Sequence, residues 1–359
     1  MGLSPNRVRE FCTAYDIRVP MLLAPMAGAS PASLSIAVAN AGGLGACGVL
    51  LMEPKAIHAW ADEFRAYSKG SFQLNLWTPD PPPRRDPAAE LAVREFLGNW
   101  GVTVAADADD AVPVDFDAQC EAVLAVRPSV ISSVMGLFAP SMVDRMKNAN
   151  IKWFATATTV SEARAAERAG ADAIIAQGME AGGHRGAFDA SQAERDLIGL
   201  FSLLPAIVDA VRIPVIATGG IGDARGVAAA LVLGASSVQI GTGFLRCPEA
   251  MLAPAWADAI GRSLPEDTLV TRAFSGRPGR AIATAYARAA TDSDAPPPAP
   301  YPVQRGLTQA MRAAGAKNND IDRIQAWAGQ SAAMAVALPA ADVVAQLWTG
   351  ARELLEWQW

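Results

Sequence analysis

The side chains with the clearest chemical potential lie in the glycine-rich segment Glu180-Ala-Gly-Gly-His-Arg-Gly186. The chain has only two histidines, and His184 follows two glycines, where a side chain can face a ligand. An imidazole has a pKa of about 6.5 and exchanges a proton near neutral pH, so we predict that His184 is catalytic. His58 lies on a predicted outer helix, where we expect a structural role. We expect no metal at His184, because no second histidine or tight carboxylate cluster lies near it.

Two further glycine-rich segments, residues 217–223 and 239–243, follow runs typical of β-strands. Glycine lets a backbone approach a ligand closely, and free N–H groups at the start of a helix favour an anion. Asp223 is placed to cap the helix that follows the first segment. These features predict a phosphate site; tight turns that need positive φ are the alternative explanation for the glycines.

Two other strand ends carry residues suited to a flat ring system. The first apolar run ends in Ala24, Pro25 and Met26, where a flexible thioether and backbone groups can face a ring. Asn75 is a polar residue inside the apolar run 72–77. A buried amide needs hydrogen-bond partners, and a ligand edge is a reasonable one.

Eight short apolar runs recur between helical stretches, and they position these residues. Continuous apolar runs are typical of strands that are buried on both faces. The intervening stretches carry helix signals, as in 161–170 and 223–234, which have a capping residue and a terminal glycine. The predicted strands are 21–27, 44–49, 72–77, 130–136, 153–158, 173–178, 214–220 and 237–244.

This alternation predicts an α/β fold, a (β/α)₈ TIM barrel, because each parallel strand pair needs a crossover and the helices then cover the sheet. A doubly wound open sheet is the alternative. The count of eight runs and the lack of a G-x-G-x-x-G segment after the first run favour the barrel.

Two excursions exceed a minimal barrel, one at residues 78–115 and one after the eighth run. Barrel active sites lie at the carboxyl ends of the strands, so we expect the excursions to cap the site; peripheral loops are the alternative. We expect residues 1–250 to form the barrel, 251–324 a cap or substrate subdomain, and 325–359 a segment that returns to the barrel.

Charge and cysteine usage exclude several classes of protein. The formal net charge is −6, and no dense basic stretch predicts binding to nucleic acid or to an anionic membrane. The four cysteines lie far apart without a C-x-x-C pair, which is typical of reduced thiols in the cytosol. The apolar stretch 331–348 is interrupted by Pro339 and Asp342, so it predicts two helical segments instead of a membrane span. The start of the chain lacks a secretory pattern. We expect a cytoplasmic protein.

Together, several segments resemble the nitronate monooxygenase family, formerly called 2-nitropropane dioxygenases. Their order and spacing match across nearly the whole chain, and the Gly-Gly-His motif is the most specific. Residues 301–304 and 326–330 resemble the tail of the bacterial class I branch. The other segments are 24–28, 40–45, the strand with Asn75, 180–186, 217–221 and 241–244.

The resemblance implies a non-covalently bound FMN over the carboxyl ends of the strands. The residues implied in binding its ring region are Ala24, Pro25, Met26, Asn75, Gln177, Gly182 and Gly183. The residues implied around its phosphate are Gly219, Gly220, Gln239, Gly241 and Thr242. Trp327, Gly329 and Gln330 would return from the tail to the same pocket, and His184 and Tyr301 would face the substrate.

The resemblance also implies a reaction. In the family, an alkyl nitronate gives one electron to the flavin, the flavin semiquinone passes it to O₂, and a carbonyl compound and nitrite result. His184 would be the base toward a neutral nitroalkane and would orient the anionic nitronate. Relatives often carry several pocket tyrosines, but this chain has none between Tyr67 and Tyr286, which leaves Tyr301. The expected partners are a small nitro compound and O₂, and the expected assembly is a monomer or homodimer.

Two other functions stay open from the sequence. One is an NAD(P)H-dependent quinone or enoyl-thioester reductase on the same flavin barrel. The other is a low-turnover FMN-binding protein, in which His184 only satisfies its loop. The residue after His184 is Arg185, whereas the quinone reductases carry a proline at that position. Arg185 therefore favours a nitronate monooxygenase over a quinone reductase.

Overall fold

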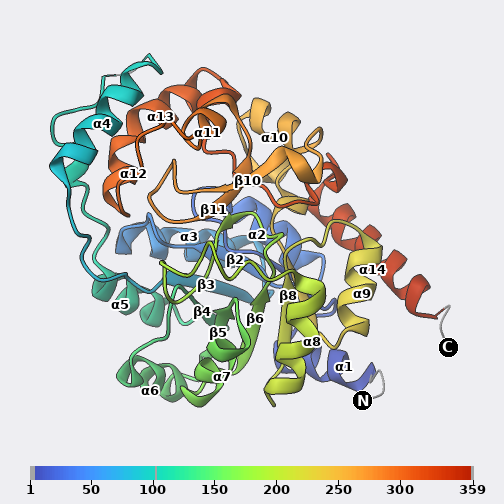
Figure 1. Ribbon diagram of the computed structural model, residues 1–359. Helices are drawn as coiled ribbons and strands as arrows, with labels where there is room; N and C mark the ends of the chain where they lie inside the picture. The colour runs from blue at the N-terminus through green and yellow to red at the C-terminus, as the bar shows by residue number, and fades with distance from the viewer. Residues whose placement is uncertain (1–4, 102, 357–359) are drawn as a thin grey trace.

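A ring of eight parallel strands forms the body of the protein in the computed structural model, which describes residues 5–101 and 103–356 (Figure 1). The strand order is β1-β9-β8-β6-β5-β4-β3-β2. A parallel bridge between Leu22 and Leu44 joins β1 to β2 and closes the ring. This confirms the predicted (β/α)₈ barrel over the open sheet. The strands are β1 (Met21–Leu23), β2 (Gly45–Gly48), β3 (Phe72–Trp77), β4 (Val130–Val134), β5 (Lys152–Ala157), β6 (Ala173–Gln177), β8 (Val215–Thr218) and β9 (Ser237–Ile240).

Helices connect the strands and cover the outside of the barrel (Figure 1). The helices of the barrel are α2 (Ala32–Asn40), α3 (Pro54–Tyr67), α5 (Phe116–Val126), α6 (Pro140–Asn148), α7 (Val160–Arg168), α8 (Leu200–Ala210) and α9 (Ala224–Val232). At the end of the chain, α14 (Ala340–Glu356) packs against α9 and α2. It therefore closes the ring of helices beside β1 and β9.

Several predicted strands ended too late along the chain. The first run was predicted through residue 27, but β1 stops at Leu23, because Pro25 has no N–H to offer a neighbouring strand. The seventh run was predicted through residue 220, but β8 stops at Thr218. Gly219 and Gly220 follow with φ of +105° and +70°, which no strand residue adopts. The residues beyond the strand ends form the loops of the candidate site.

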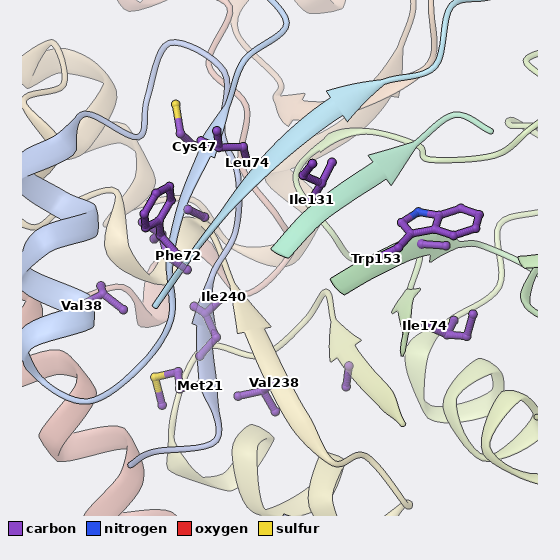
Figure 2. Packing of buried hydrophobic residues seen from close by; sticks show 14 of the residues in the cluster. Met21, Val38, Cys47, Phe72, Leu74, Ile131, Trp153, Ile174, Val238 and Ile240 are labelled. Carbon is purple, nitrogen blue, oxygen red and sulfur yellow. The ribbon is translucent and has the colours of Figure 1, made fainter. Parts of the chain in front are cut away.

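The strand side chains alternate between two cores, as the two-residue period of a strand requires. Leu22 points inward and packs with Phe154, Ile175 and Ile216 inside the barrel. Met21 points outward to the core under the helices, where Figure 2 shows it near Val238 and Ile240. Burying each such side chain stabilises the fold by about 1.5–3 kcal/mol.

The amino-terminal end of the barrel is filled by α1 (Pro5–Ala14). Phe11 and Tyr15 reach the inner core, and the Tyr15 ring lies edge-on to Phe154 with centroids 4.8 Å apart. This end is therefore a packed core, which leaves the opposite end for a ligand.

A smaller antiparallel sheet lies over the carboxyl ends of the barrel strands. Its order is β10-β11-β7, formed by β7 (Gly183–His184), β10 (Thr268–Thr271) and β11 (Gly279–Ile282). His184 is paired with Gly279. The predicted open loop around His184 is thus a short strand that is fixed to residues of the second excursion.

The two excursions share a hydrophobic core above the barrel (Figure 1). Val93 and Leu97 of the first excursion pack with Phe274, Tyr286 and Leu307 of the second. The helices here are α4 (Pro87–Gly98), α10 (Pro254–Ile260), α11 (Ala285–Ala289), α12 (Val303–Leu307) and α13 (Gln309–Lys317). The single 3₁₀ turns are η1 (Ala108–Asp110), η2 (Thr242–Phe244), η3 (Pro248–Ala250), η4 (Pro265–Asp267), η5 (Ile321–Arg323) and η6 (Ala332–Met334). The predicted domain boundaries themselves stay predictions.

The structure corrects the predictions for the segment 331–348 and for the start of the helix near residue 161. In the stretch 331–348, only the 3₁₀ turn η6 forms before Pro339, so the first of the two predicted helices is wrong; α14 begins directly after the proline. The predicted cap at Ser161 is wrong, because α7 begins at Val160 and its cap is Thr159, whose hydroxyl accepts from the Glu162 N–H. Within residues 5–101 and 103–356, no helix is long and apolar enough to cross a membrane.

Candidate active site

A cavity of about 400 Å³ lies at the carboxyl ends of the barrel strands, under the small antiparallel sheet. It brings together most of the predicted site residues, although these come from the ends of five barrel strands and the tail. The predicted residues that line it are Ala24, Pro25, Met26, Asn75, Gln177, Gly182, Gly183, His184, Gly219, Gly220, Gln239, Gly241, Thr242, Trp327 and Gly329.

Two predicted residues do not line this cavity. Gln330 instead donates its backbone N–H to the carbonyl of Glu180 at 2.9 Å, which ties the tail to the glycine-rich segment. Tyr301 lies behind Trp77, with the two rings stacked at a centroid distance of 5.0 Å and an interplanar angle of 14°. The Tyr301 side chain borders a neighbouring cavity.

The backbone around His184 is held from both sides. The Gln177 side chain donates to the carbonyl of His184 at 3.1 Å and accepts from the Gly186 N–H at 2.8 Å. The buried guanidinium of Arg185 donates to the carbonyls of Gln177 and Gly178 at 3.1 and 2.9 Å. The amide of Gln177 is therefore engaged by the protein, and its structural role is to position this segment.

The imidazole of His184 is enclosed by aromatic rings and anchored at one nitrogen. Trp77 and Trp327 lie edge-on to it, with centroids 4.8 and 4.9 Å away. Its Nε2 lies 2.8 Å from Oγ of Ser275. That hydroxyl also donates to the carbonyl of Arg277 at 3.2 Å. Among the described residues, Nδ1 has no hydrogen-bond partner, so it is the nitrogen that is free to act on a ligand.

The charge state of His184 differs from the sequence expectation. Burial lowers the pKa of His184, and the nearby guanidinium groups of Arg277, Arg305 and Arg312 add to the shift; together they give a pKa of about 3. Both effects disfavour the imidazolium. The expectation of a pKa near the ordinary 6.5 was therefore wrong, and the ring is neutral at neutral pH.

The three arginines are residues that the sequence analysis missed. Arg277 pairs with Asp80 and donates to the carbonyl of Ala187. Arg305 and Arg312 line the cavity, and burial lowers the pKa of both guanidinium groups. In the part of the chain that the structure describes, no carboxylate pairs with either. The only sequence signal of Arg305 and Arg312 is their spacing of seven residues, which is common on any helical surface.

The glycine loops after β8 and β9 form the other side of the cavity. The backbone N–H groups of Gly219, Gly220 and Gly241 find no acceptor among the described residues, and free N–H groups beside a cavity are suited to an anion. The side chain of Asp223 accepts from the first N–H groups of α9, at Arg225 and Gly226. The predicted cap at Asp223 is therefore confirmed, and the N–H groups left for an anion are those of the glycine loops.

Gly182 and Gly329 explain how the tail reaches the site. A Cβ atom on Gly182 would lie 2.5 Å from the Gly329 nitrogen, and one on Gly329 would lie 2.7 Å from the Glu180 carbonyl oxygen. Only glycine permits this approach of two backbones. The close contact places Trp327 beside His184.

The arrangement combines a glycine loop with free N–H groups, a cleft lined by backbone and thioether groups, and an imidazole of lowered pKa near two guanidinium groups that pair with no carboxylate of the described residues. Within the described residues, no group of three or more His, Cys, Asp or Glu side chains could hold a metal ion.

The nitronate monooxygenase family model matches residues 9–350. The chain belongs to the nitronate monooxygenase family. It is therefore an oxidoreductase, and the family is flavin-dependent.

Individual members of the nitronate monooxygenase family are similar over nearly their full length. A nitronate monooxygenase of Paraburkholderia phytofirmans is 38% identical over 356 residues, which cover 97% of this chain and 96% of the relative. A probable nitronate monooxygenase of Staphylococcus aureus is 35% identical over 360 residues, with 98% and 99% covered.

Solved structures of the same fold include a nitroalkane oxidase from Streptomyces ansochromogenes. It is 34% identical with a TM-score of 0.88, and the match covers 96% of this chain and 98% of that chain. FabK from Thermotoga maritima is 27% identical with a TM-score of 0.76, and 97% of each chain is covered. The likeness to the nitroalkane oxidase agrees with membership of the nitronate monooxygenase family and supports oxidation of nitronates or nitroalkanes.

Proposed function

We propose that this protein uses FMN to oxidise alkyl nitronates, and neutral nitroalkanes, with O₂ to a carbonyl compound and nitrite. The observation that carries the proposal is the neutral His184, which lies in one cavity with two unpaired guanidinium groups and an anion-binding glycine loop. A base without charge and a positive potential together suit a substrate that is neutral before proton loss and anionic after it.

The residues present fit FMN. The free N–H groups of Gly219, Gly220 and Gly241 would hold its phosphate, since they lack acceptors. Asn75 donates to Ser132 at 3.0 Å, and its carbonyl oxygen is left to accept from the flavin ring. Bound FMN supplies the acceptor for the substrate's electrons and their transfer to O₂. The remaining predicted contacts, from Ala24, Pro25, Met26, Gln239 and Thr242, border the same cavity.

His184 would move the proton through Nδ1. A hydroxyl has one proton, and in this proposal Ser275 donates it to the carbonyl of Arg277, 3.2 Å away. Nε2 of His184 then carries the hydrogen that Oγ of Ser275 accepts, and Nδ1 presents a lone pair. Nδ1 takes the proton from the carbon that bears the nitro group. The resulting imidazolium forms beside an anionic nitronate, whose opposite charge raises the histidine pKa during the step.

Arg305 and Arg312 would attract and hold the anion. Both are largely buried and line the cavity, so their charges act in a region of lower dielectric than water. When the substrate is supplied as the nitronate, no proton is removed, and His184 only orients the anion. The two substrates therefore separate the role of the base from the role of the arginines.

The purified protein and its His184→Asn variant test the proposal. We expect a yellow protein that releases free FMN on heating. We expect His184→Asn to lower kcat/KM for a neutral nitroalkane by roughly 10²–10⁴-fold and that for the nitronate by far less. Equal rates in variant and wild type, with FMN bound, would show that His184 only satisfies its loop.

Anaerobic reduction tests the alternative reductases. We expect NADH and NADPH to bleach the bound flavin hardly at all, whereas a nitronate bleaches it. Rapid bleaching by either nucleotide would instead favour a quinone or enoyl-thioester reductase.

A further inference from the structure

A second cavity of about 530 Å³ lies directly beside the candidate active site. Leu50 and Trp77 border both cavities. The Trp77 ring lies edge-on to His184 on one side and stacks on Tyr301 on the other. The partition between the reacting group and the second cavity is therefore a layer of two aromatic rings.

The inside of the second cavity is apolar. Its lining is rich in proline, including Pro79, Pro81–Pro83 and Pro113, with Val114 and Val303. Proline has a fixed φ and no N–H, so these walls keep their shape and offer no backbone donors. A hollow of this kind exists before a ligand arrives, as small-molecule sites usually do.

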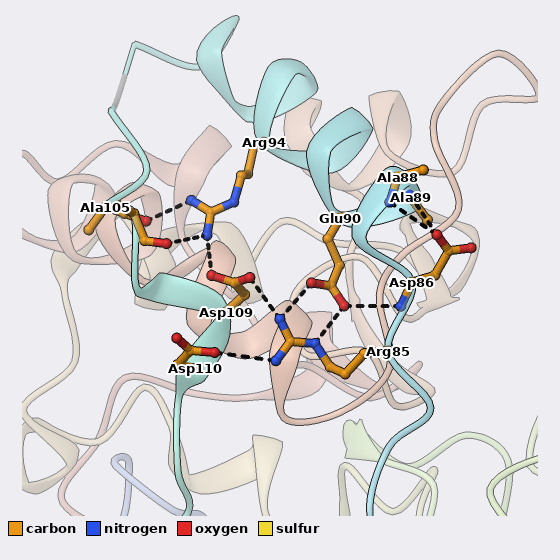
Figure 3. Close-up of polar contacts among 10 residues, drawn as sticks. Arg85, Asp86, Ala88, Ala89, Glu90, Arg94, Ala105, Asp109 and Asp110 are labelled. Carbon is orange, nitrogen blue, oxygen red and sulfur yellow. Dashed lines mark hydrogen bonds and ion pairs between the residues drawn. The ribbon is translucent and has the colours of Figure 1, made fainter.

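The charged residues that border the second cavity neutralise one another. Arg85 pairs with Glu90 at 2.6 Å, with Asp109 at 2.7 Å and with Asp110 at 3.4 Å (Figure 3). Asp80 pairs with Arg277. The charges in the active-site cavity differ, because Arg305 and Arg312 have no carboxylate partner among the described residues. One cavity thus suits an anionic head, and the other suits an apolar group.

The two rings of the partition differ in how the backbone holds them, and Tyr301 lies outside every helix and strand. Trp77 is the last residue of β3 and is held in the barrel sheet. The Tyr301 hydroxyl has no hydrogen-bond partner in the described part of the chain, although a buried tyrosine usually has one. A rotation of this side chain would open a path past the edge of the Trp77 ring, along Leu50, which borders both cavities, and it would break no hydrogen bond of the described residues.

We propose that the second cavity binds the alkyl substituent of a long-chain nitronate or nitroalkane, with the nitro group at His184 and the tail beyond the rings of Trp77 and Tyr301. This inference rests on the proposed function. It assigns the enzyme a preference for substrates with a long, unbranched alkyl chain over substrates with a short one. Each methylene that enters the cavity raises kcat/KM by about threefold to fourfold.

Steady-state kinetics with nitroethane, 1-nitrobutane, 1-nitrohexane and 1-nitrooctane, each as its nitronate, test the preference. We expect kcat/KM to rise along the series once the chain passes Trp77. Val114→Trp fills the second cavity and should reduce the ratio of kcat/KM for 1-nitrooctane to that for nitroethane by at least tenfold. The matched control is Val232→Trp on the exposed side of α9, which should keep the wild-type ratio.

Tyr301→Ala gives an independent arm in the opposite direction. Removing the ring joins the cavities, so the rise in kcat/KM should begin at a shorter chain. A wild-type series that is flat, or a ratio that neither Val114→Trp nor Tyr301→Ala changes, would overturn the proposal while nitronate oxidation itself stands.

Calorimetric binding of propanoate, hexanoate and octanoate to the yellow protein separates the two proposals. These carboxylates carry an anionic head but are not oxidised. Tighter binding of the longer chains, lost in Val114→Trp, supports the second cavity even if no nitronate is turned over. Affinity that does not depend on chain length refutes it.

Discussion

The depressed pKa of His184 predicts an unusual acid titration. Burial and the charges of Arg277, Arg305 and Arg312 give a pKa of about 3 in the folded protein. At pH 5, about one molecule in a hundred would then carry the imidazolium, whereas an imidazole with a pKa of 6.5 would be almost fully protonated. Acidification from pH 7 to pH 5 should therefore leave His184 neutral.

Nitrogen NMR of protein labelled with ¹⁵N-histidine measures this directly, because the chain has only two histidines. The signals of the exposed His58 are identified by their loss in His58→Gln. We expect the ring nitrogens of His184 to keep the pattern of a neutral imidazole down to pH 5, with the hydrogen on Nε2. Ser275→Ala should disturb that tautomer, since it removes the acceptor for the Nε2 hydrogen.

The lowered pKa of His184 also makes the free energy of unfolding depend on pH, and the folded state becomes less stable as the pH falls. The folded pKa lies below the unfolded value of about 6.5, so the unfolded chain takes up the proton first as the pH falls. The stabilisation is complete above about pH 6.5 and is lost progressively toward pH 3. Between pH 6 and pH 5 the contribution of His184 to the free energy of unfolding falls by about 1 kcal/mol. His184→Asn should abolish this pH dependence, and urea unfolding at a fixed FMN concentration measures it.

Two results would refute this reasoning. One is a His184 signal that titrates between pH 5.5 and pH 7. The other is the same pH dependence of the free energy of unfolding in wild type and His184→Asn. The acid limb of kcat/KM for a neutral nitroalkane gives a third check, since it reports the free enzyme and should stay flat from pH 7 to pH 5.

Three other substitutions test separate parts of the structure. Gly220→Val should expel FMN, because φ at this position is +70° and a branched side chain would change the path of the loop. Flavin absorbance after desalting measures the loss of FMN. The control is Gly98→Val, whose side chain would enter open space, and this variant should stay yellow. Arg305→Gln should raise KM for a nitronate by roughly tenfold or more, and it should raise KM for a neutral nitroalkane by less. The control is Arg288→Gln on the exposed surface, which should leave both KM values unchanged. Equal effects on both substrates would contradict a role of Arg305 in holding the anion. Phe11→Ala should lower the free energy of unfolding by about 3–5 kcal/mol, because it leaves a cavity at the closed end of the barrel; a loss below 1 kcal/mol in chemical denaturation would show that α1 does not fill that end.

Local signals in the sequence determined the barrel and the region of its site. Each strand is an apolar run whose pattern depends only on residues near one another, so all eight strands form at the predicted runs, although several end earlier than predicted. The segments that follow them carry glycines and Asp223, whose backbone and capping preferences are also local. Since parallel strands bring their carboxyl ends to one side of a barrel, strand order alone gathered most of the cavity residues.

Tertiary structure alone decided the chemistry of His184. Its partner Ser275 is 91 positions away, and the arginines that surround it come from the second excursion, whose path no local pattern describes. Desolvation depends on the total burial of the ring, so the sequence left the pKa at its ordinary value. The same holds for Tyr301, which the fold places behind Trp77 and beside a second cavity. Residue types and their order are written in the chain, but charge states and neighbours follow from packing between segments that lie far apart in it.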